Sequence, residues 1–123
     1  MIRIIGVQRN QTPNSEFILL QNQGSMRINI RGHAIVSDLS IDSIAGLANG
    51  HVFHDDIGVP PGMYVLLRTG FGEPRWGRTK EGALVYHAFM NRDQSVWGEG
   101  CGPIHVLSIQ HSYVERPAPI SIR

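Results

Sequence analysis

Apolar and polar residues alternate with a period of two along much of the chain. The clearest run is residues 26–31, in which every second residue is apolar. This alternation is typical of a strand that turns one face toward a core. The preceding run, 16–22, is apolar on both faces, and the turn residues between 22 and 25 predict that the two runs form a hairpin. Gly32 then predicts a bend before the next apolar run at 33–36.

The rest of the chain carries more short strand-like runs separated by turn residues. A turn with two prolines and a glycine at 59–62 leads into residues 63–68, which predict a central strand buried on both sides. Residues 69–82 are rich in Gly, Pro and charge and are predicted to form a long exposed loop. Between 39 and 50 the spacing of apolar residues fits one short helix. Seven or eight short strands predict an all-β sandwich or barrel, the others lying at 1–7, 51–54, 83–89, 95–97 and 103–109.

Composition limits the classes of protein that the chain can belong to. At 123 residues, with 41% hydrophobic and 17% charged residues, it matches one globular domain spanning 1–123, with 116–123 as an extended tail or edge strand. The formal net charge of +1 gives no broad field toward nucleic acid or anionic lipid. Cys101 is the only cysteine, so one chain forms neither a disulfide nor a cysteine-based zinc site. With neither a signal peptide nor a membrane-spanning apolar stretch in the sequence, we expect a soluble, cytoplasmic protein without membrane contact.

Three blocks of sequence resemble the lamin-tail domain family in their order along the chain. They are 16–24 followed by 28–38, then 59–65, then 95–97 leading to 104–107, and the strand ending in Thr69-Gly70 adds a further likeness. The resemblance implies an immunoglobulin-like antiparallel β-sandwich of seven to nine short strands with at most one short helix. It also implies a non-catalytic interaction or targeting module, since such domains bind proteins and in some cases DNA or chromatin. No cofactor and no catalytic residue follow from the resemblance.

His51, His54, Asp55 and Asp56 form the densest group of metal ligands or acid and base groups in the sequence. On a strand, residues three apart point to opposite faces, so the two histidines chelate one metal only if the chain turns between them. The alternative is two polar strand-end histidines beside a solvated turn. A third ligand from His87, His105 or His111 would need the fold to bring it close, and the sequence favours hydrogen-bonded or exposed histidines there.

Arg75, Trp76, Arg78 and Lys80 combine three cations with an aromatic ring in the predicted loop. This arrangement contacts phosphates and stacks a base in nucleic-acid-binding proteins, and its alternative is an ordinary charged loop flanked by Glu73 and Glu81.

Two further residues are interpreted as structural. Cys101 lies among glycines in a turn, without the base and oxyanion donor that a nucleophile requires. Trp97 is predicted to fill the core between two sheets.

The sequence therefore favours a binding module over an enzyme. We expect it to bind a protein partner or a second copy of itself through surface loops or an edge strand near 117–123. Two alternatives remain open: nucleic-acid or anion binding through Arg75 to Lys80, and a small metal-dependent hydrolase that uses His51, His54, Asp55 and Asp56.

Overall fold

The structure is all-β, as the period-two alternation predicts. The computed structural model describes residues 1–38 and 50–108, so the predicted helix between 39 and 50 and the tail at 116–123 lie outside the described residues. Within these ranges ten strands form three sheets, joined by loops and two short 3-10 turns, η1 (Pro13–Ser15) and η2 (Glu99–Cys101). No helix in the described part is long and apolar enough to cross a membrane.

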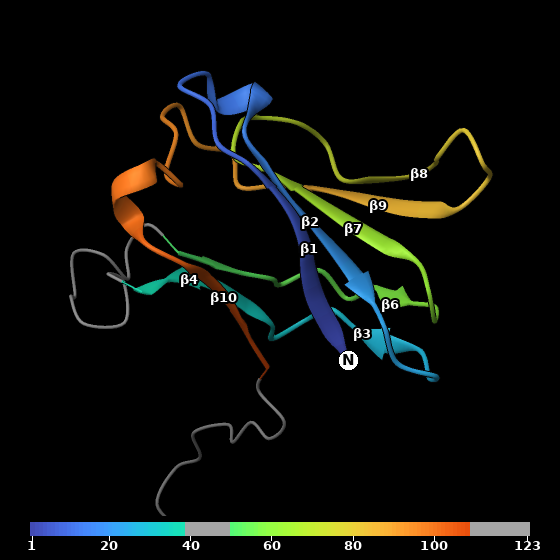
Figure 1. The fold of residues 1–123 in the computed structure, drawn as a ribbon. Helices are drawn as coiled ribbons and strands as arrows, with labels where there is room; N and C mark the ends of the chain where they lie inside the picture. Colours follow the sequence, from blue (N-terminus) through green and yellow to red (C-terminus); the bar gives the residue numbers. More distant parts are fainter. Residues whose placement is uncertain (39–49, 109–123) are drawn as a thin grey trace, which may run out of the picture.

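Five strands form the largest sheet, in the order β1-β2-β7-β9-β8. Their bounds are β1 (Ile2–Gln8), β2 (Phe17–Asn22), β7 (Tyr64–Arg68), β8 (Arg75–Arg78) and β9 (Leu84–Phe89). Neighbours are antiparallel except β7 and β9, which are parallel. The fully antiparallel sheet that we expected is therefore wrong at this pair. The chain leaves β7, passes the position of β9 to form β8, and turns back to form β9 between them (Figure 1).

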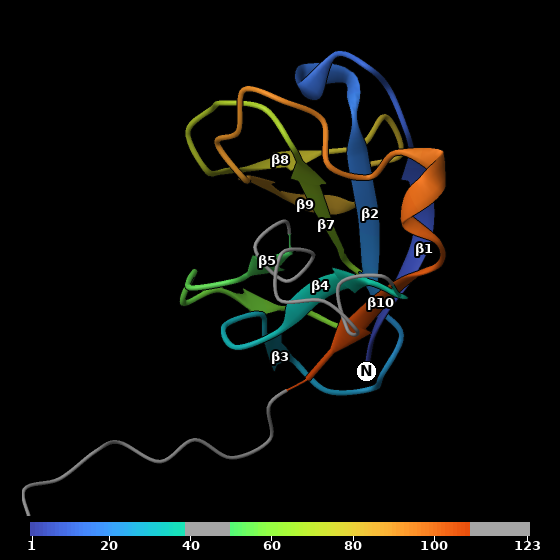
Figure 2. The same ribbon diagram turned by 90° about the vertical axis from the view of Figure 1, so that its left-hand side faces the viewer.

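The second layer contains a three-stranded sheet and a two-stranded ribbon. The sheet has the order β10 (Ile104–Leu107), β4 (Ala34–Ser37), β5 (His51–Val52), and the ribbon pairs β3 (Ile28–Asn29) with β6 (Gly58–Val59). Figure 2 shows β5, β4 and β10 side by side below the five-stranded sheet. Two layers facing each other are compatible with a β-sandwich, and ten strands exceed the seven to nine that we expected.

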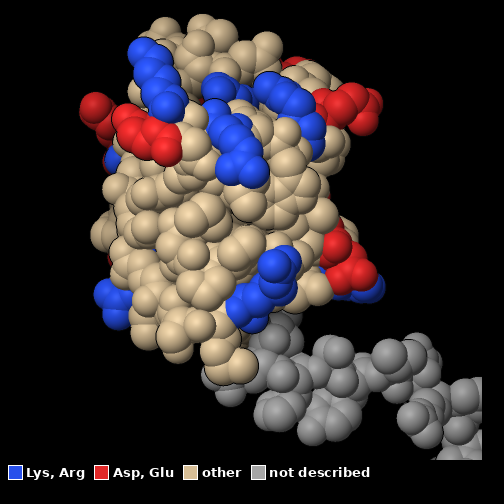
Figure 3. All heavy atoms as spheres, turned by 90° about the vertical axis from the view of Figure 1, so that its right-hand side faces the viewer, with Lys and Arg blue, Asp and Glu red and all other residues tan. Residues whose placement is uncertain are grey.

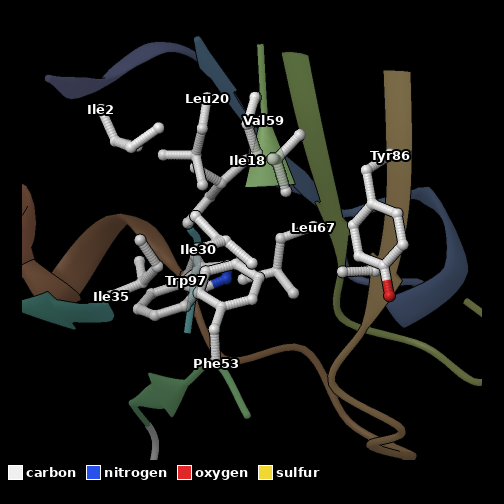
Figure 4. Close-up of a cluster of buried hydrophobic side chains, with 12 residues drawn as sticks. Ile2, Ile18, Leu20, Ile30, Ile35, Phe53, Val59, Leu67, Tyr86 and Trp97 are labelled. Carbon is white, nitrogen blue, oxygen red and sulfur yellow. The ribbon is translucent and has the colours of Figure 1, made fainter. Parts of the chain in front are cut away.

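The core lies between these layers and is built by alternate residues of the strands. In β2 and β7 the buried positions alternate with half-buried ones, so each strand sends one set of side chains inward. Trp97 is only 1% exposed and lies among side chains from both layers (Figure 4), which confirms its core position. The cluster consists of Ile2, Ile18, Leu20, Ile30, Ile35, Phe53, Val59, Val65, Leu67, Tyr86, Ala88 and Trp97.

The predicted hairpin between 16–22 and 26–31 is wrong. β2 pairs with β1 and β7, whereas β3 crosses to the other layer and pairs with β6. The side chain of Asn22 explains the crossing, because it is fully buried and donates to the carbonyl oxygens of Met26 (2.8 Å) and Val59 (2.9 Å). These bonds hold the turn against β6 and carry the chain out of the first sheet. The bend predicted at Gly32 is confirmed, since this residue adopts a φ of 86° between β3 and β4.

The predicted strand at 95–97 is also wrong. The backbone N–H groups of Val96 and Trp97 donate to the carboxylate of Glu16, at 2.9 Å and 3.3 Å, and not to a neighbouring strand. A buried side chain thus replaces the ladder that this segment would need to be a strand. The strand that follows, β10, pairs with β4.

The segment 69–82 is not one long loop, because it contains β8. β8 pairs antiparallel with β9, and the chain returns through a turn closed by Gly82 N–H donating to the Thr79 carbonyl oxygen at 3.0 Å. Gly82 adopts a φ of 88°, which a residue with a side chain would adopt only with strain. Three of the candidate binding residues therefore lie on a strand and one in the turn after it.

Candidate functional site

β8 is the last strand of the five-stranded sheet, with β9 on one side and no strand of the described ranges on the other. Thr79 N–H donates to the Ala83 carbonyl oxygen at 2.8 Å, which fixes the alternation of hydrogen-bonded pairs along this ladder. Two residues earlier, Gly77 is the next residue bonded to β9, so the backbone N–H and C=O groups of Trp76 and Arg78 point to the open side. The strand therefore offers a row of backbone donors and acceptors to a further strand.

The side chains of β8 divide between the two faces of the sheet. Trp76 is opposite Tyr86 and shares its inward face, with the two ring centroids 5.3 Å apart. Arg78 lies on the same face opposite Leu84, and its Nη1 donates to the Gly82 carbonyl oxygen at 2.8 Å. Arg75 is opposite His87 on the outward face. Of the three cations that neighbour Trp76 in the sequence, only Arg78 therefore shares its face of the sheet. Arg75 points to the other face, and Lys80 lies in the turn after β8.

A groove runs beside β8 on its inward face, between the five-stranded sheet and the β3-β6 ribbon. Its volume is about 410 Å³. Trp76, which is 40% exposed, forms one wall. The groove is lined by Arg27, Ile57, Gly58, Pro60, Trp76 and Leu84. Sequence reasoning missed all of these except Trp76, because Arg27, Ile57, Gly58 and Pro60 lie 15 residues or more before β8 and Leu84 lies on the next strand, β9.

The cations of β8, of the turn after it and of the groove are not neutralised by carboxylates in the described part of the chain, although Arg27 and Arg78 each donate to a backbone carbonyl oxygen. Arg27, Arg75, Arg78 and Lys80 form no ion pair with a carboxylate of the described residues. The strand carries two arginines and no acidic residue, and the only charged residue that lines the groove is Arg27. In Figure 3, which faces the end of the molecule where the β8-β9 turn lies, blue side chains gather at the upper level between red ones, and below them the surface is mostly uncharged apart from a few charged side chains near the bottom and at the edges.

The base of the site is held by a hydrogen bond between the layers. The Tyr86 hydroxyl donates to the Asp55 carboxylate at 2.6 Å. Burial and this bond raise the pKa of Tyr86 well above its usual range. The bond ties the strand beneath Trp76 to the segment that precedes β6, and it fixes one side of the groove.

The histidine and aspartate side chains at 51–56, which the sequence groups as metal ligands, each lie in a different environment. His51 packs edge-on against Phe53, with ring centroids 4.7 Å apart, and burial lowers its pKa to about 4, although nearby Asp55 acts in the opposite direction. His54 is exposed, Asp55 bonds to Tyr86, and Asp56 accepts a hydrogen bond from Asn29 Nδ2 at 2.6 Å. Across residues 1–38 and 50–108, no group of three or more His, Cys, Asp or Glu side chains converges on one point.

The other candidate groups lie apart from one another. His87 is on the outward face of β9, where burial, with Arg75 and Arg68 nearby, lowers its pKa. His105 of β10 contacts the Asp38 carboxylate. The half-buried Cys101 directs its Sγ toward the Gly102 carbonyl oxygen at 3.4 Å. His111 lies outside the described residues.

A larger hollow of about 660 Å³ lies among residues 90–96 and Phe71. None of its lining residues belongs to a strand, so it offers no open backbone ladder. For this reason the groove beside β8 is the better candidate for recognition of a partner.

No protein-family model, curated protein or solved structure matches the chain. The resemblance to lamin-tail domains therefore stays a prediction from the sequence motifs.

Proposed function

We propose that this protein is a non-catalytic interaction module that binds an extended segment of another protein along β8. The observation that carries the proposal is the position of β8: it is the edge of the five-stranded sheet, with the backbone of Trp76 and Arg78 open and a groove directly beside them. In strand addition, main-chain hydrogen bonds supply affinity and pockets for alternate side chains supply selectivity. Both parts are available here on one edge.

A different protein is a better partner for this edge than a second copy of the chain. If two β8 strands paired antiparallel about Gly77, Arg78 of one copy would lie opposite Trp76 of the other, and the two Arg78 side chains would be diagonal neighbours on the inward face. Diagonal neighbours lie about 7–8 Å apart, so two guanidinium groups at these positions repel each other. The charges of β8 therefore act against self-pairing and favour a segment of opposite charge.

The two other functions that the sequence leaves open have less support. A nucleic-acid strip needs the aromatic ring and the cations on one surface, whereas Trp76 and Arg75 lie on opposite faces of the sheet. A metal-dependent hydrolase needs open ligands, whereas Asp55 and Asp56 both accept hydrogen bonds within the fold. A role for the tail at 117–123 in self-association stays a prediction.

We also propose that the two-layered fold is the immunoglobulin-like sandwich of lamin-tail domains. The ordered motifs at 16–24, 28–38, 59–65 and 95–107 support this assignment. An interaction or targeting role would agree with the open edge at β8.

A pair of proline substitutions tests whether the edge binds. Arg78→Pro removes an N–H that points to the open side and fills that side with the proline ring. Gly98→Pro is the matched control away from β8, because Gly98 has a φ of −56°, close to that of proline, and a Cβ added there would meet no atom within 4 Å. Both variants should keep the far-ultraviolet circular dichroism of the parent.

The binding assay is selection of twelve-residue peptides from a phage-displayed library on the full chain. We expect enriched peptides to bind the parent and the Gly98→Pro variant and to lose at least tenfold in affinity for Arg78→Pro. The proposal fails if no peptide is enriched, or if every enriched peptide binds Arg78→Pro as tightly as the parent.

A further inference from the structure

We infer that the segment bound by β8 is acidic and places one apolar side chain in the groove beside Trp76. This inference rests on the proposed function and adds the chemistry of the partner. It follows from three features of the site: which way the side chains of β8 point, what lines the groove, and where charge is found along the edge.

The inward face of the site fits an apolar side chain of the bound segment, here called the anchor. A strand added beside β8 would continue the pleat of the sheet, so its residue opposite Trp76 would point toward the groove. The groove has Ile57 and Pro60 on one side and Leu84 and Trp76 on the other. Its volume of about 410 Å³ accommodates one medium-sized aliphatic side chain together with the backbone that carries it. Burying the exposed part of Trp76 adds to the affinity.

The positive charges along β8 favour carboxylates next to the anchor in the bound segment. Arg78 follows Trp76 by two residues on the same face, about 7 Å along the strand, and Arg27 lies in the groove itself. Arg75 meets the outward side chains of an added strand. Carboxylates on both faces of the added segment would therefore each find a guanidinium, which binds carboxylates with paired hydrogen bonds.

The acidic part of the segment should be short. Glu73 lies two residues before β8 and Glu81 three residues after it. An acidic run longer than the strand would meet these like charges at both ends. The site thus fits about five residues, with the anchor near the middle and carboxylates on either side.

Three synthetic peptides test this inference directly. The first has one leucine flanked on each side by two glutamates, with threonine and glycine ends and a fluorescein label. In the second each glutamate is replaced by glutamine, and in the third the leucine is replaced by serine. Fluorescence anisotropy with the full chain measures binding of each peptide at about 50 mM salt and again at about 500 mM.

We expect the first peptide to bind at least tenfold more tightly than either of the others, and to lose this advantage over the glutamine peptide at high salt. Trp76→Ala should weaken it about 30-fold. Arg27→Gln and Arg78→Gln should each weaken it about threefold to fivefold. Arg3→Gln is the matched control, because Arg3 lies on β1 at the opposite edge of the sheet, and it should leave the affinity unchanged.

Equal binding of the three peptides, or no binding of the first, overturns the inference. A single-stranded thymidine oligonucleotide is tested in parallel, and its Trp76-dependent binding without binding of the acidic peptide would assign the groove to nucleic acid instead. The phage selection keeps the two proposals apart. If it yields Arg78→Pro-sensitive peptides that are neutral or basic, the edge binds but its selectivity is not the one inferred here.

Discussion

Replacement of Glu16 should destabilise the fold more than any change at the surface. Its side chain is fully buried, and its carboxylate accepts hydrogen bonds from Thr69 Oγ1 at 2.7 Å, Val96 N at 2.9 Å and Trp97 N at 3.3 Å. Glu16→Ala leaves three donors without this acceptor. At about 1–3 kcal/mol for each buried unpaired donor, with some relief from entering water, the free energy of unfolding should fall by roughly 3–5 kcal/mol.

Two milder variants separate the hydrogen bonds from the loss of volume. Glu16→Gln keeps one acceptor oxygen and nearly the same shape, so we expect a loss of about 1–2 kcal/mol. Thr69→Val removes only the hydroxyl and should cost about 1 kcal/mol. Since Thr69 and Glu16 are bonded partners, the combined variant should lose less than the sum of the two single losses.

Equilibrium unfolding in urea, followed by circular dichroism, measures each of these losses. The dependence of the free energy of unfolding on urea concentration should be the same in all variants. The reasoning is refuted if Glu16→Ala lies within 1 kcal/mol of the parent protein. Strict additivity of Glu16→Gln and Thr69→Val would also count against the bond between them.

Further changes test other parts of the fold. Burial lowers the pKa of His51 from 6.5 to about 4, so the folded state favours the neutral ring. The resulting stability is complete above pH 6.5 and falls by about 3 kcal/mol as the pH drops from 6.5 to 4; urea midpoints of the parent should show this loss and those of His51→Phe should lack it. Trp97→Ala should remove about 3–5 kcal/mol or unfold the protein, as measured by thermal melting. Gly70→Ala should lower the melting temperature, because its new Cβ would lie 1.6 Å from Asn14 Oδ1, and adding Asn14→Ala should recover most of that loss.

The strands that the sequence predicted best are the inner strands of the large sheet, which apolar runs mark, although β7 is fully buried on one face only and not on both as expected. β2, β7 and β9 are inner strands of the large sheet, and their apolar runs at 16–22, 63–68 and 83–89 mark them in the sequence. β8 has no apolar run in the sequence, because an edge strand needs few apolar residues and Trp76 is the only large apolar residue of this strand. A run rich in arginine and glycine therefore indicated a loop.

Contacts between distant segments account for most of the other differences. Residues 95–97 have a strand-like composition, but Glu16, 80 residues away from Val96, takes their backbone N–H groups. The groove is likewise formed by Arg27, Ile57 and Pro60 against Trp76. Local sequence patterns do not indicate contacts between distant segments. The sequence therefore predicted Trp76 as a binding residue but not the residues that form the groove with it.

Amide hydrogen exchange of β8, followed by NMR with and without the leucine-centred glutamate peptide, tests the open edge most directly. In the free protein we expect Gly77 to be protected by its bonds to β9, whereas Trp76 and Arg78 exchange rapidly. Addition of the peptide should slow exchange at Trp76 and Arg78 selectively. Rapid exchange at all three residues in the free protein, or unchanged exchange at Trp76 and Arg78 with the peptide bound, would contradict strand addition at this edge.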